Sequence, residues 1–325
     1  MLPLRVFPLR RNILKFRRQG DLEMSSTGAI RMLHLPVGTQ EMYGVFSPDR
    51  SRLLTGGDGP KPKVHIWDVQ TGICLQTLLG HQQPVAALAW TKDQRRVASG
   101  AFDQCVRLWD AGSGERICVL EGHESYVRSV EFSQSQQQLL SGSGDGAVRL
   151  WELSTGKLLR TFKGHSDGVY HAIFDASETR ILSGGRDGTI RLWEVHTGRC
   201  LRVIDGPGAH VQSTVWHSDQ RRFLSCAGEI RLWDSETGEC LRVYTGHTDT
   251  IRSVAWGPDE RYILSASHDR SVRIWDSETA DCIQVLKGHK ECIINAAWDL
   301  DRKSVLSCDS TGRLRVWAID SATVR

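Results

Sequence analysis

The feature that most constrains the fold of this 325-residue sequence is a tryptophan that returns at an almost fixed interval. Each of seven tryptophans follows a β-branched residue or a leucine, and successive members are 42, 42, 42, 40, 42 and 42 residues apart. The series is Trp67, Trp109, Trp151, Trp193, Trp233, Trp275 and Trp317. Such a period indicates one structural unit repeated seven times, rather than two ordinary domains.

A second aromatic series runs in phase with the first: Phe46, Trp90, Phe132, Phe174, Trp216, Trp256 and Trp298. Each unit reads as four short strands separated by turns, which in the third unit are expected at 127–132, 139–142, 148–151 and 158–162. Short strands at this spacing, with a period of 40–45 residues, are typical of propeller blades. The sequence therefore predicts an all-β, seven-bladed β-propeller with four antiparallel strands per blade.

Six of the seven tryptophans precede Asp or Glu, and Gly-His pairs stand before five of the units, at Gly80-His81, Gly122-His123, Gly164-His165, Gly246-His247 and Gly288-His289. These motifs resemble the WD-repeat (WD40) family over about residues 26–320. The resemblance implies a propeller over residues 25–325, preceded by a basic tail at 1–24. The last unit lacks an outer strand, and residues 26–33 match the outer-strand sequence at 154–161, so we expect residues near 28–34 to complete the last blade.

Four repeats carry His, Ser, Asp and Trp in one frame: His81, Ser99, Asp103 and Trp109; His123, Ser141, Asp145 and Trp151; His165, Ser183, Asp187 and Trp193; His247, Ser265, Asp269 and Trp275. A catalytic triad needs one exposed nucleophile with an oxyanion hole, whereas four near-identical copies describe a repeated structural module. The resemblance implies a buried hydrogen-bond network. No residue is therefore predicted to be catalytic, and the chain is not expected to be an enzyme.

Three repeats depart from this frame. Repeat one has Val37 where His is expected, repeat five has Pro207 there, and repeat seven has Thr311 in place of Asp. We expect these three blades to be locally less stable. Asp309 lies two residues away from the position that Asp has in the regular repeats, so we expect its substitution to lower the stability of the protein only slightly.

The resemblance places partner contacts on one face of the ring, here called the top face, formed by the loops that lead into the innermost strands and by the turns before each repeat's Asp. Carried onto this chain, the contact residues are Phe102, Tyr126, Arg128, Tyr170, Arg186, His210, Arg252 and His268. Ordinary solvated loop chemistry is the alternative interpretation. Aromatic and positively charged side chains together favour binding of a protein or peptide partner that is acidic or phosphorylated.

Charge is concentrated at the N-terminus: the first twenty residues contain six basic residues and no acidic one, which leaves 35 bases and 38 acids elsewhere. The body is therefore not expected to bind nucleic acid. No apolar run is long enough for a transmembrane segment. The tail is interpreted as a docking segment, a disordered segment or a mitochondrial signal. Cytoplasmic localisation is expected; mitochondrial is the alternative, and a nuclear location stays open.

Nine cysteines form no Cys-x-x-Cys pair, so neither a metal site nor a cofactor is predicted, and a reducing compartment is expected. Cys74, Cys200, Cys240 and Cys282 share one repeat position and are interpreted as small buried hydrophobes.

The predicted function is a non-enzymatic interaction scaffold or adaptor, a monomeric propeller within a hetero-complex. One alternative is a sensor or regulatory subunit of a larger signalling or defence complex, and another is a propeller enzyme.

Overall fold

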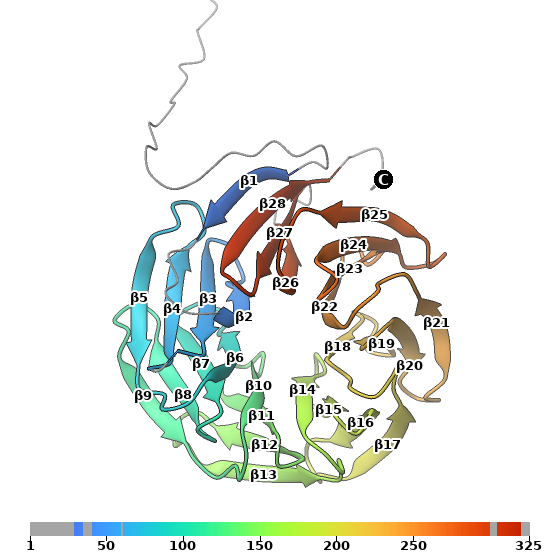
Figure 1. Cartoon of the computed structure of the whole chain (residues 1–325). Coiled ribbons are helices and arrows are strands. Elements are labelled where there is room, and N and C mark those ends of the chain that lie inside the picture. Colours follow the sequence, from blue (N-terminus) through green and yellow to red (C-terminus); the bar gives the residue numbers. More distant parts are fainter. Residues whose placement is uncertain (1–28, 35–40, 60, 300–303, 320–325) are drawn as a thin grey trace, which may run out of the picture.

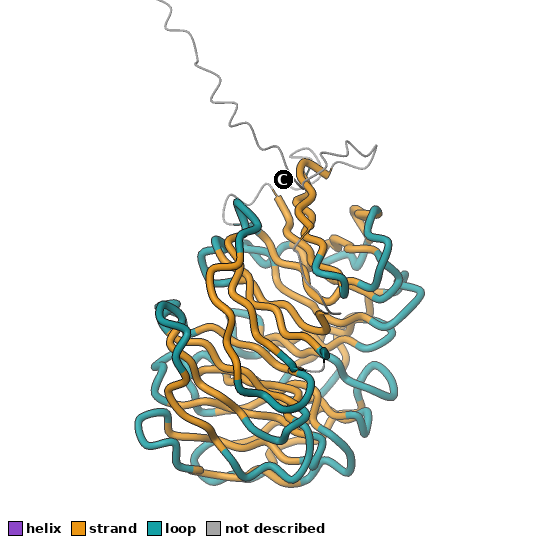
Figure 2. The backbone as a smooth tube through the Cα atoms, turned by 60° about the vertical axis from the view of Figure 1, so that its left-hand side comes forward, coloured by secondary structure: helices purple, strands orange, loops and turns teal. Residues whose placement is uncertain are grey.

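The computed structural model describes residues 29–34, 41–59, 61–299 and 304–319, and it arranges 28 strands in seven four-stranded antiparallel sheets around a central axis (Figure 1). The view in Figure 2 shows strands joined by loops and turns. The predicted fold class is thereby confirmed. The described residues include no helix that is long and apolar enough to cross a membrane.

The sheets are the blades of the propeller, and the first six run in chain order from an inner strand at the axis to an outer strand at the rim. From inner to outer strand, blades one to six are β2 (Glu41–Phe46), β3 (Arg52–Gly57), β4 (Lys63–Asp68) and β5 (Cys74–Leu79); β6 (Val85–Trp90), β7 (Arg96–Ala101), β8 (Val106–Asp110) and β9 (Arg116–Leu120); β10 (Val127–Phe132), β11 (Gln138–Ser143), β12 (Ala147–Glu152) and β13 (Leu158–Lys163); β14 (Val169–Phe174), β15 (Arg180–Gly185), β16 (Thr189–Glu194) and β17 (Cys200–Asp205); β18 (Ser213–Trp216), β19 (Arg222–Cys226), β20 (Ile230–Asp234) and β21 (Cys240–Tyr244); β22 (Ile251–Trp256), β23 (Tyr262–Ser267), β24 (Ser271–Asp276) and β25 (Cys282–Lys287).

The seventh blade combines three strands from the end of the chain with one from its beginning. It contains β26 (Ile293–Trp298), β27 (Ser304–Asp309) and β28 (Arg313–Ala318), and β1 (Ala29–His34) pairs antiparallel with β28 at the outer edge. The register places Ala29 opposite Trp317 and His34 opposite Arg313. Residues 1–28 lie outside the described residues, and with them the predicted basic tail; so does Val37.

The apolar core lies between neighbouring blades. In one cluster Val148 and Leu150 of blade three pack with Val169, Phe174 and Trp193 of blade four. The inner three strands of a blade are covered on both faces by its neighbours, whereas outer strands such as β13 leave one face to solvent. This burial explains why the second strands read as nearly continuous apolar and small residues rather than as a strict alternation.

In blades one to four, the close approach of the next blade requires glycine in the second strand. A Cβ on Gly100 of β7 would lie 2.5 Å from Cγ1 of Val127, which begins the inner strand of the next blade. The same juxtaposition recurs between Gly142 and Val169 at 2.8 Å. Glycine therefore allows the close packing between these blades.

The cysteine interpretation is wrong in part. All nine cysteines are free, and the four that share a repeat position lie on outer strands as predicted, but Cys240 and Cys282 are exposed. Outer strands have a neighbouring strand on one edge only and a solvent-facing surface, so this position does not become buried as it would on an inner strand.

Candidate functional site: the top face and the channel mouth

The His, Ser, Asp and Trp residues of each regular repeat form one continuous hydrogen-bonded chain. In blade three, Nδ1 of His123 donates to Oδ2 of Asp145 at 3.0 Å, and its Nε2 lies 2.7 Å from the Ser141 hydroxyl. The Trp151 indole donates to the same hydroxyl at 2.8 Å. Equivalent bonds occur in blades two, four and six. The chain ties the incoming loop to the second and third strands.

The charge states of this network are set by burial and by its own hydrogen bonds. Burial lowers the pKa of His81, which keeps the imidazole neutral at pH 7. Burial alone would raise the pKa of Asp103, but hydrogen bonds from His81 and from the Gln82 amide, with Arg107 nearby, bring it to about 2. Ser99 is fully buried and already bonded to His and Trp. The geometry leaves no room for a substrate at this hydroxyl.

In blades two and three, an arginine two residues before the tryptophan extends the network. Arg107 and Arg149 are buried, and their Nη1 atoms lie 2.6 Å from Oδ2 of Asp103 and Asp145. Beside the glycine of the Gly80-His81 pair, a Cβ would lie 3.7 Å from Nε of Arg107. These two arginines are therefore buried, ion-paired members of the network.

Repeat seven requires a correction, because Asp309 takes the role that the repeat frame assigned to position 311. Its Oδ2 accepts a hydrogen bond from Nδ1 of His289 at 2.9 Å, and its side chain is fully buried. Ser307 bonds both His289 and the Trp317 indole. Alternate residues of a strand share a face, so a carboxylate two residues after the serine reaches the same histidine. Thr311 donates to Asp309 at 2.7 Å instead.

Blades one and five keep only part of the network. In blade one the Trp67 indole donates to the hydroxyl of Thr55, at 2.8 Å, where the regular repeats have serine. In blade five Pro207 is buried at the histidine position, and Arg231 pairs with Glu229 at 2.6 Å. Their lower local stability stays a prediction.

On the top face, Phe102 and Tyr126 form a stacked pair, with ring centroids 4.9 Å apart and planes at 19°. Phe102 belongs to the turn between β7 and β8 of blade two, and Tyr126 to the loop that enters blade three. Phe102 is 38% exposed, which makes the pair an apolar surface open to a partner. Gly144 makes room for the tyrosine, because a Cβ there would lie 2.5 Å from Cε1 of Tyr126.

Next to this pair, Arg128 lies between two tyrosine rings. Its guanidinium carbon is 4.4 Å from the centroid of Tyr170 and 5.6 Å from that of Tyr43, and Nη1 donates a hydrogen bond to the Tyr43 hydroxyl. Burial lowers the pKa of Arg128. The three residues come from blades three, four and one, so they converge at the mouth of the channel rather than along one loop.

Arg252 and His268 approach the same mouth from blade six. The guanidinium carbon of Arg252 is 5.4 Å from the Tyr43 centroid, and its Nη1 donates to Oε1 of Gln212 at 2.9 Å. Burial and the neighbouring charge of Arg252 lower the pKa of His268. Four of the predicted contact residues, Arg128, Tyr170, Arg252 and His268, are thus brought together around the axis.

His210 and Arg186 lie further out on the top face. The His210 ring lies 6.0 Å from the Tyr170 ring, and its Nδ1 donates to the backbone oxygen of Arg186 at 3.1 Å. The Arg186 side chain is exposed and lies 3.5 Å from Asp167. An exposed ion pair of this kind contributes little to stability. These two residues form the outer margin of the patch.

Tyr43 is the residue that the sequence interpretation missed. It lies in the irregular first repeat, three positions before Phe46 of the second aromatic series. The same spacing from that series gives Ser129 and His171, which also line the channel. Counting back from the aromatic series, rather than forward from the missing Gly-His pair, is the signal that finds it.

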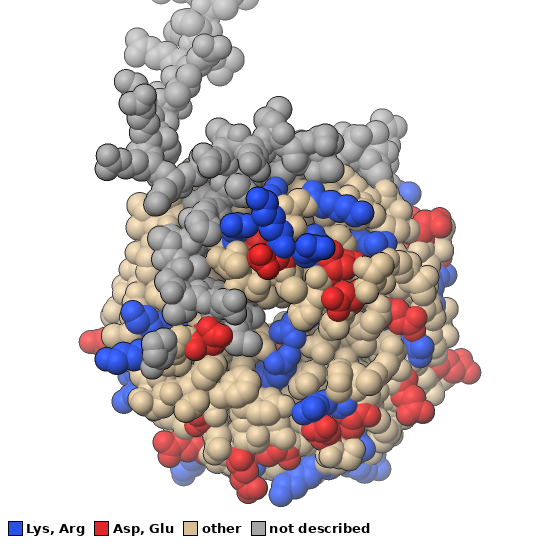
Figure 3. Space-filling model, viewed as in Figure 1, with Lys and Arg blue, Asp and Glu red and all other residues tan. Residues whose placement is uncertain are grey.

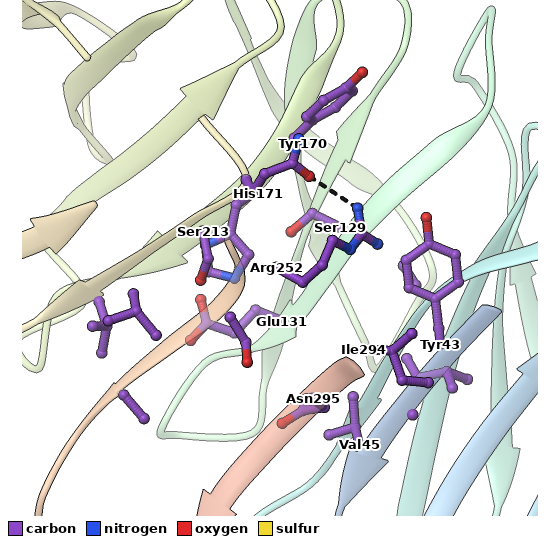
Figure 4. Close-up of a pocket in the computed structure, with 18 of the residues that line it drawn as sticks. Tyr43, Val45, Ser129, Glu131, Tyr170, His171, Ser213, Arg252, Ile294 and Asn295 are labelled. Carbon is purple, nitrogen blue, oxygen red and sulfur yellow. Dashed lines mark hydrogen bonds between the residues drawn. The ribbon is translucent and has the colours of Figure 1, made fainter. Parts of the chain in front are cut away.

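A central channel of about 430 Å³ runs below the patch and is lined by the inner strands of the blades. Figure 3 shows basic side chains at the centre of the ring, and Figure 4 shows Tyr43, Tyr170 and Arg252 around the opening, with Glu131 and His171 below. Burial raises the pKa of Glu131 to about 8, although the Phe174 amide donates to its Oε2 at 2.9 Å. Burial lowers the pKa of His171 to about 4, so both groups are uncharged at pH 7.

The channel and the top face carry no cluster of metal ligands: within the parts of the chain that the structure describes, no three His, Cys, Asp or Glu residues are grouped to hold an ion. What the mouth offers instead is flat aromatic surface, two guanidinium groups and hydrogen-bonding side chains. These are the residue types that anchor protein partners.

Comparison with known proteins agrees with the repeat pattern. Six segments match the family described as "WD domain, G-beta repeat", at residues 72–110, 114–152, 156–194, 198–234, 238–276 and 280–318. A 55-residue segment is 36% identical to the periodic tryptophan protein 2 homolog of Schizosaccharomyces pombe, and a 44-residue segment is 39% identical to periodic tryptophan protein 2 of Saccharomyces cerevisiae. These segments cover 17% and 14% of this chain but only 6% and 5% of those proteins.

The six matched segments span well over half of the sequence, each one contains a tryptophan of the first series, and the structure forms a blade around each of those tryptophans. The chain therefore belongs to the WD40 repeat family.

Proposed function

We propose that this chain is a non-enzymatic scaffold that binds a protein or peptide through the patch formed by Phe102, Tyr126, Arg128 and Tyr170. WD40 propellers generally serve as protein-interaction scaffolds. The observation that carries the proposal here is that the Phe102–Tyr126 stack and the Arg128–Tyr170 pair each join two neighbouring blades and together occupy three adjacent blades on one face. Aromatic and arginine side chains in a partly buried patch are the usual anchors of an interface.

The chemistry of the patch favours an acidic or phosphorylated partner. Arg128 and Arg252 are cationic, and the aromatic rings around them offer flat surface at little cost in conformational entropy. The propeller would act as one subunit of a hetero-complex. A sensor or regulatory role within a larger signalling or defence assembly uses the same face and differs only in what the partner does.

An enzymatic role is not supported by any site that we describe. The Ser-His-Asp sets are buried, repeated around the ring and already hydrogen bonded. The channel holds an uncharged Glu131 and an uncharged His171, each with a backbone amide as its hydrogen-bond donor. Nδ1 of His171 also lies 3.3 Å from the hydroxyl of Thr214, but Thr214 is buried and does not offer an exposed nucleophile.

The test compares partner capture by the wild type, Tyr126→Ala and Arg128→Glu, with quantitative mass spectrometry of the bound proteins. Leu201→Ala is the control, because Leu201 is an exposed apolar residue of the outer strand β17, away from the top face. We expect partner affinity to fall by roughly 2 kcal/mol or more for a central anchor, with folding changed by no more than about 0.5 kcal/mol. Full retention of the partner by both top-face variants would overturn the proposal.

A further inference from the structure

Two arginines face the same opening of the channel. Arg128 comes from β10 and Arg252 from β22, and both line the cavity. Their guanidinium carbons lie 5.6 and 5.4 Å from the centroid of the same ring, Tyr43. Burial lowers the pKa of Arg128, and the positive charge of Arg252 acts in the same direction. The mouth therefore holds two cations close enough to repel one another.

No carboxylate of the described residues forms an ion pair with either of these arginines. Among the described residues, neither Arg128 nor Arg252 lies within 4.0 Å of a carboxylate oxygen, whereas Arg107 and Arg149 each pair with a buried aspartate. Arg128 instead donates to a phenol, and Arg252 to the amide oxygen of Gln212. Each guanidinium has five N–H donors, of which these bonds use one, and both side chains line the cavity at the channel mouth.

Both side chains are held in place before any ligand arrives. Arg128 is enclosed by the Tyr43 and Tyr170 rings, and Arg252 is fixed by Gln212 and by the Tyr43 ring. Figure 4 shows Arg252 and Tyr43 at the opening. Fixing a long side chain in advance removes much of the entropy cost of binding. The site is thus built for an anion that reaches down into the mouth from the top face.

We propose that Arg128 and Arg252 together form a subsite for the phosphate of a phosphorylated side chain on the partner. The inference rests on the proposed function and deepens it. A phosphoryl group carries a charge of about −1.5 to −2 at pH 7 and has three acceptor oxygens, so it matches two guanidinium groups, whereas a carboxylate neutralises only one. The Phe102–Tyr126 stack beside the subsite would contact an apolar residue next to the phosphorylated one.

The probe is a set of fluorescent peptide libraries of random sequence in which the central residue is fixed as phosphoserine, serine or glutamate. Fluorescence anisotropy measures their binding to the full chain. We expect the phosphoserine library to bind wild type at least tenfold more tightly than either other library, and Arg252→Gln to lose at least tenfold of that binding. The control is Arg199→Gln, which removes an exposed positive charge at the turn before β17 and is expected to bind within twofold of wild type.

Equal binding of the glutamate and phosphoserine libraries would show a carboxylate site and overturn the proposal. No binding of any library, or undiminished binding to Arg252→Gln, would overturn it as well. The native partner separates this failure from failure of the proposed function. If Tyr126→Ala loses the partner while Arg252→Gln and phosphatase-treated partner bind normally, the top face is the binding site but the two arginines do not read a phosphate.

Discussion

Arg128 of blade three stacks on Tyr170 of blade four, with 4.4 Å between the guanidinium carbon and the ring centroid. A contact of this kind contributes about 0.5–1 kcal/mol at an exposed site and about 2 kcal/mol when water is excluded. Here it also joins two blades at the channel mouth. The binding patch is therefore one preformed surface held by the ring, rather than a set of independent loops.

The first prediction concerns Asp309. Asp309→Ala should lower the free energy of unfolding by roughly 1–3 kcal/mol, because it leaves the buried His289 without its acceptor. Asp145→Ala in blade three should have a similar effect. Urea denaturation measures both, with Asp167→Ala as the control, since Asp167 is exposed and pairs only weakly with Arg186. A loss for Asp309→Ala no larger than that of the control would contradict the network in blade seven.

The second prediction concerns Glu131 and pH. The folded-state pKa of about 8 lies above the ordinary 4.5, so between these values the native protein holds a proton that the unfolded chain has lost. This contribution to stability is complete below pH 4.5 and is lost as the pH rises toward 8. Glu131→Gln keeps an acceptor for the Phe174 amide but cannot ionise.

Melting temperatures at pH 5 and pH 8 test this prediction. We expect wild type to lose more stability than Glu131→Gln between the two values. An identical change in both proteins would mean that Glu131 is ionised and hydrated in the channel at neutral pH.

The third prediction concerns the pairing of the chain ends. Deleting residues 1–36 removes β1 and leaves the edge of β28 open. We expect the melting temperature to fall by more than about 5 °C, since even 1 kcal/mol corresponds to a few degrees in a domain of this size. Deleting residues 1–24 is the matched control, because it keeps β1. Equal melting temperatures for the two truncations would show that β1 does not contribute to closing the ring.

The regular part of the fold could be predicted because one period fixes it. Seven in-phase tryptophans demand seven units, and each unit buries its tryptophan against the blade that precedes it, as Trp193 of blade four packs with Val148 and Leu150 of blade three. Position within the repeat did not predict the role of Asp309. A hydrogen bond to His289 requires only that the carboxylate lies on the right face of the strand, not that it occupies the same position in every repeat. Position within the repeat did not identify Tyr43 either, because the first repeat lacks the Gly-His pair from which positions are counted.

The candidate site was predictable as a list of positions and not as a set of contacts. The sequence placed Phe102, Tyr126, Arg128 and Tyr170 on one face, but their stacking depends on the angle between blades. That angle follows from inter-blade packing such as that of Gly100 against Val127, which involves residues far from the site. Arg186 and His268 both directly precede the Asp of their repeats, yet Arg186 lies outside the mouth beside Asp167, whereas His268 lies close enough to Arg252 for that charge to lower its pKa.

Hydrogen–deuterium exchange of the chain with and without its bound partner tests the central claim most directly. Peptides that contain Phe102, residues 126–128 and Tyr170 should become protected in the complex, while the outer strands β13, β17 and β21 exchange as before, because the proposed interface lies on the top face. Protection confined to those outer strands, with unchanged exchange at the channel mouth, would contradict the assignment of the top face as the binding site.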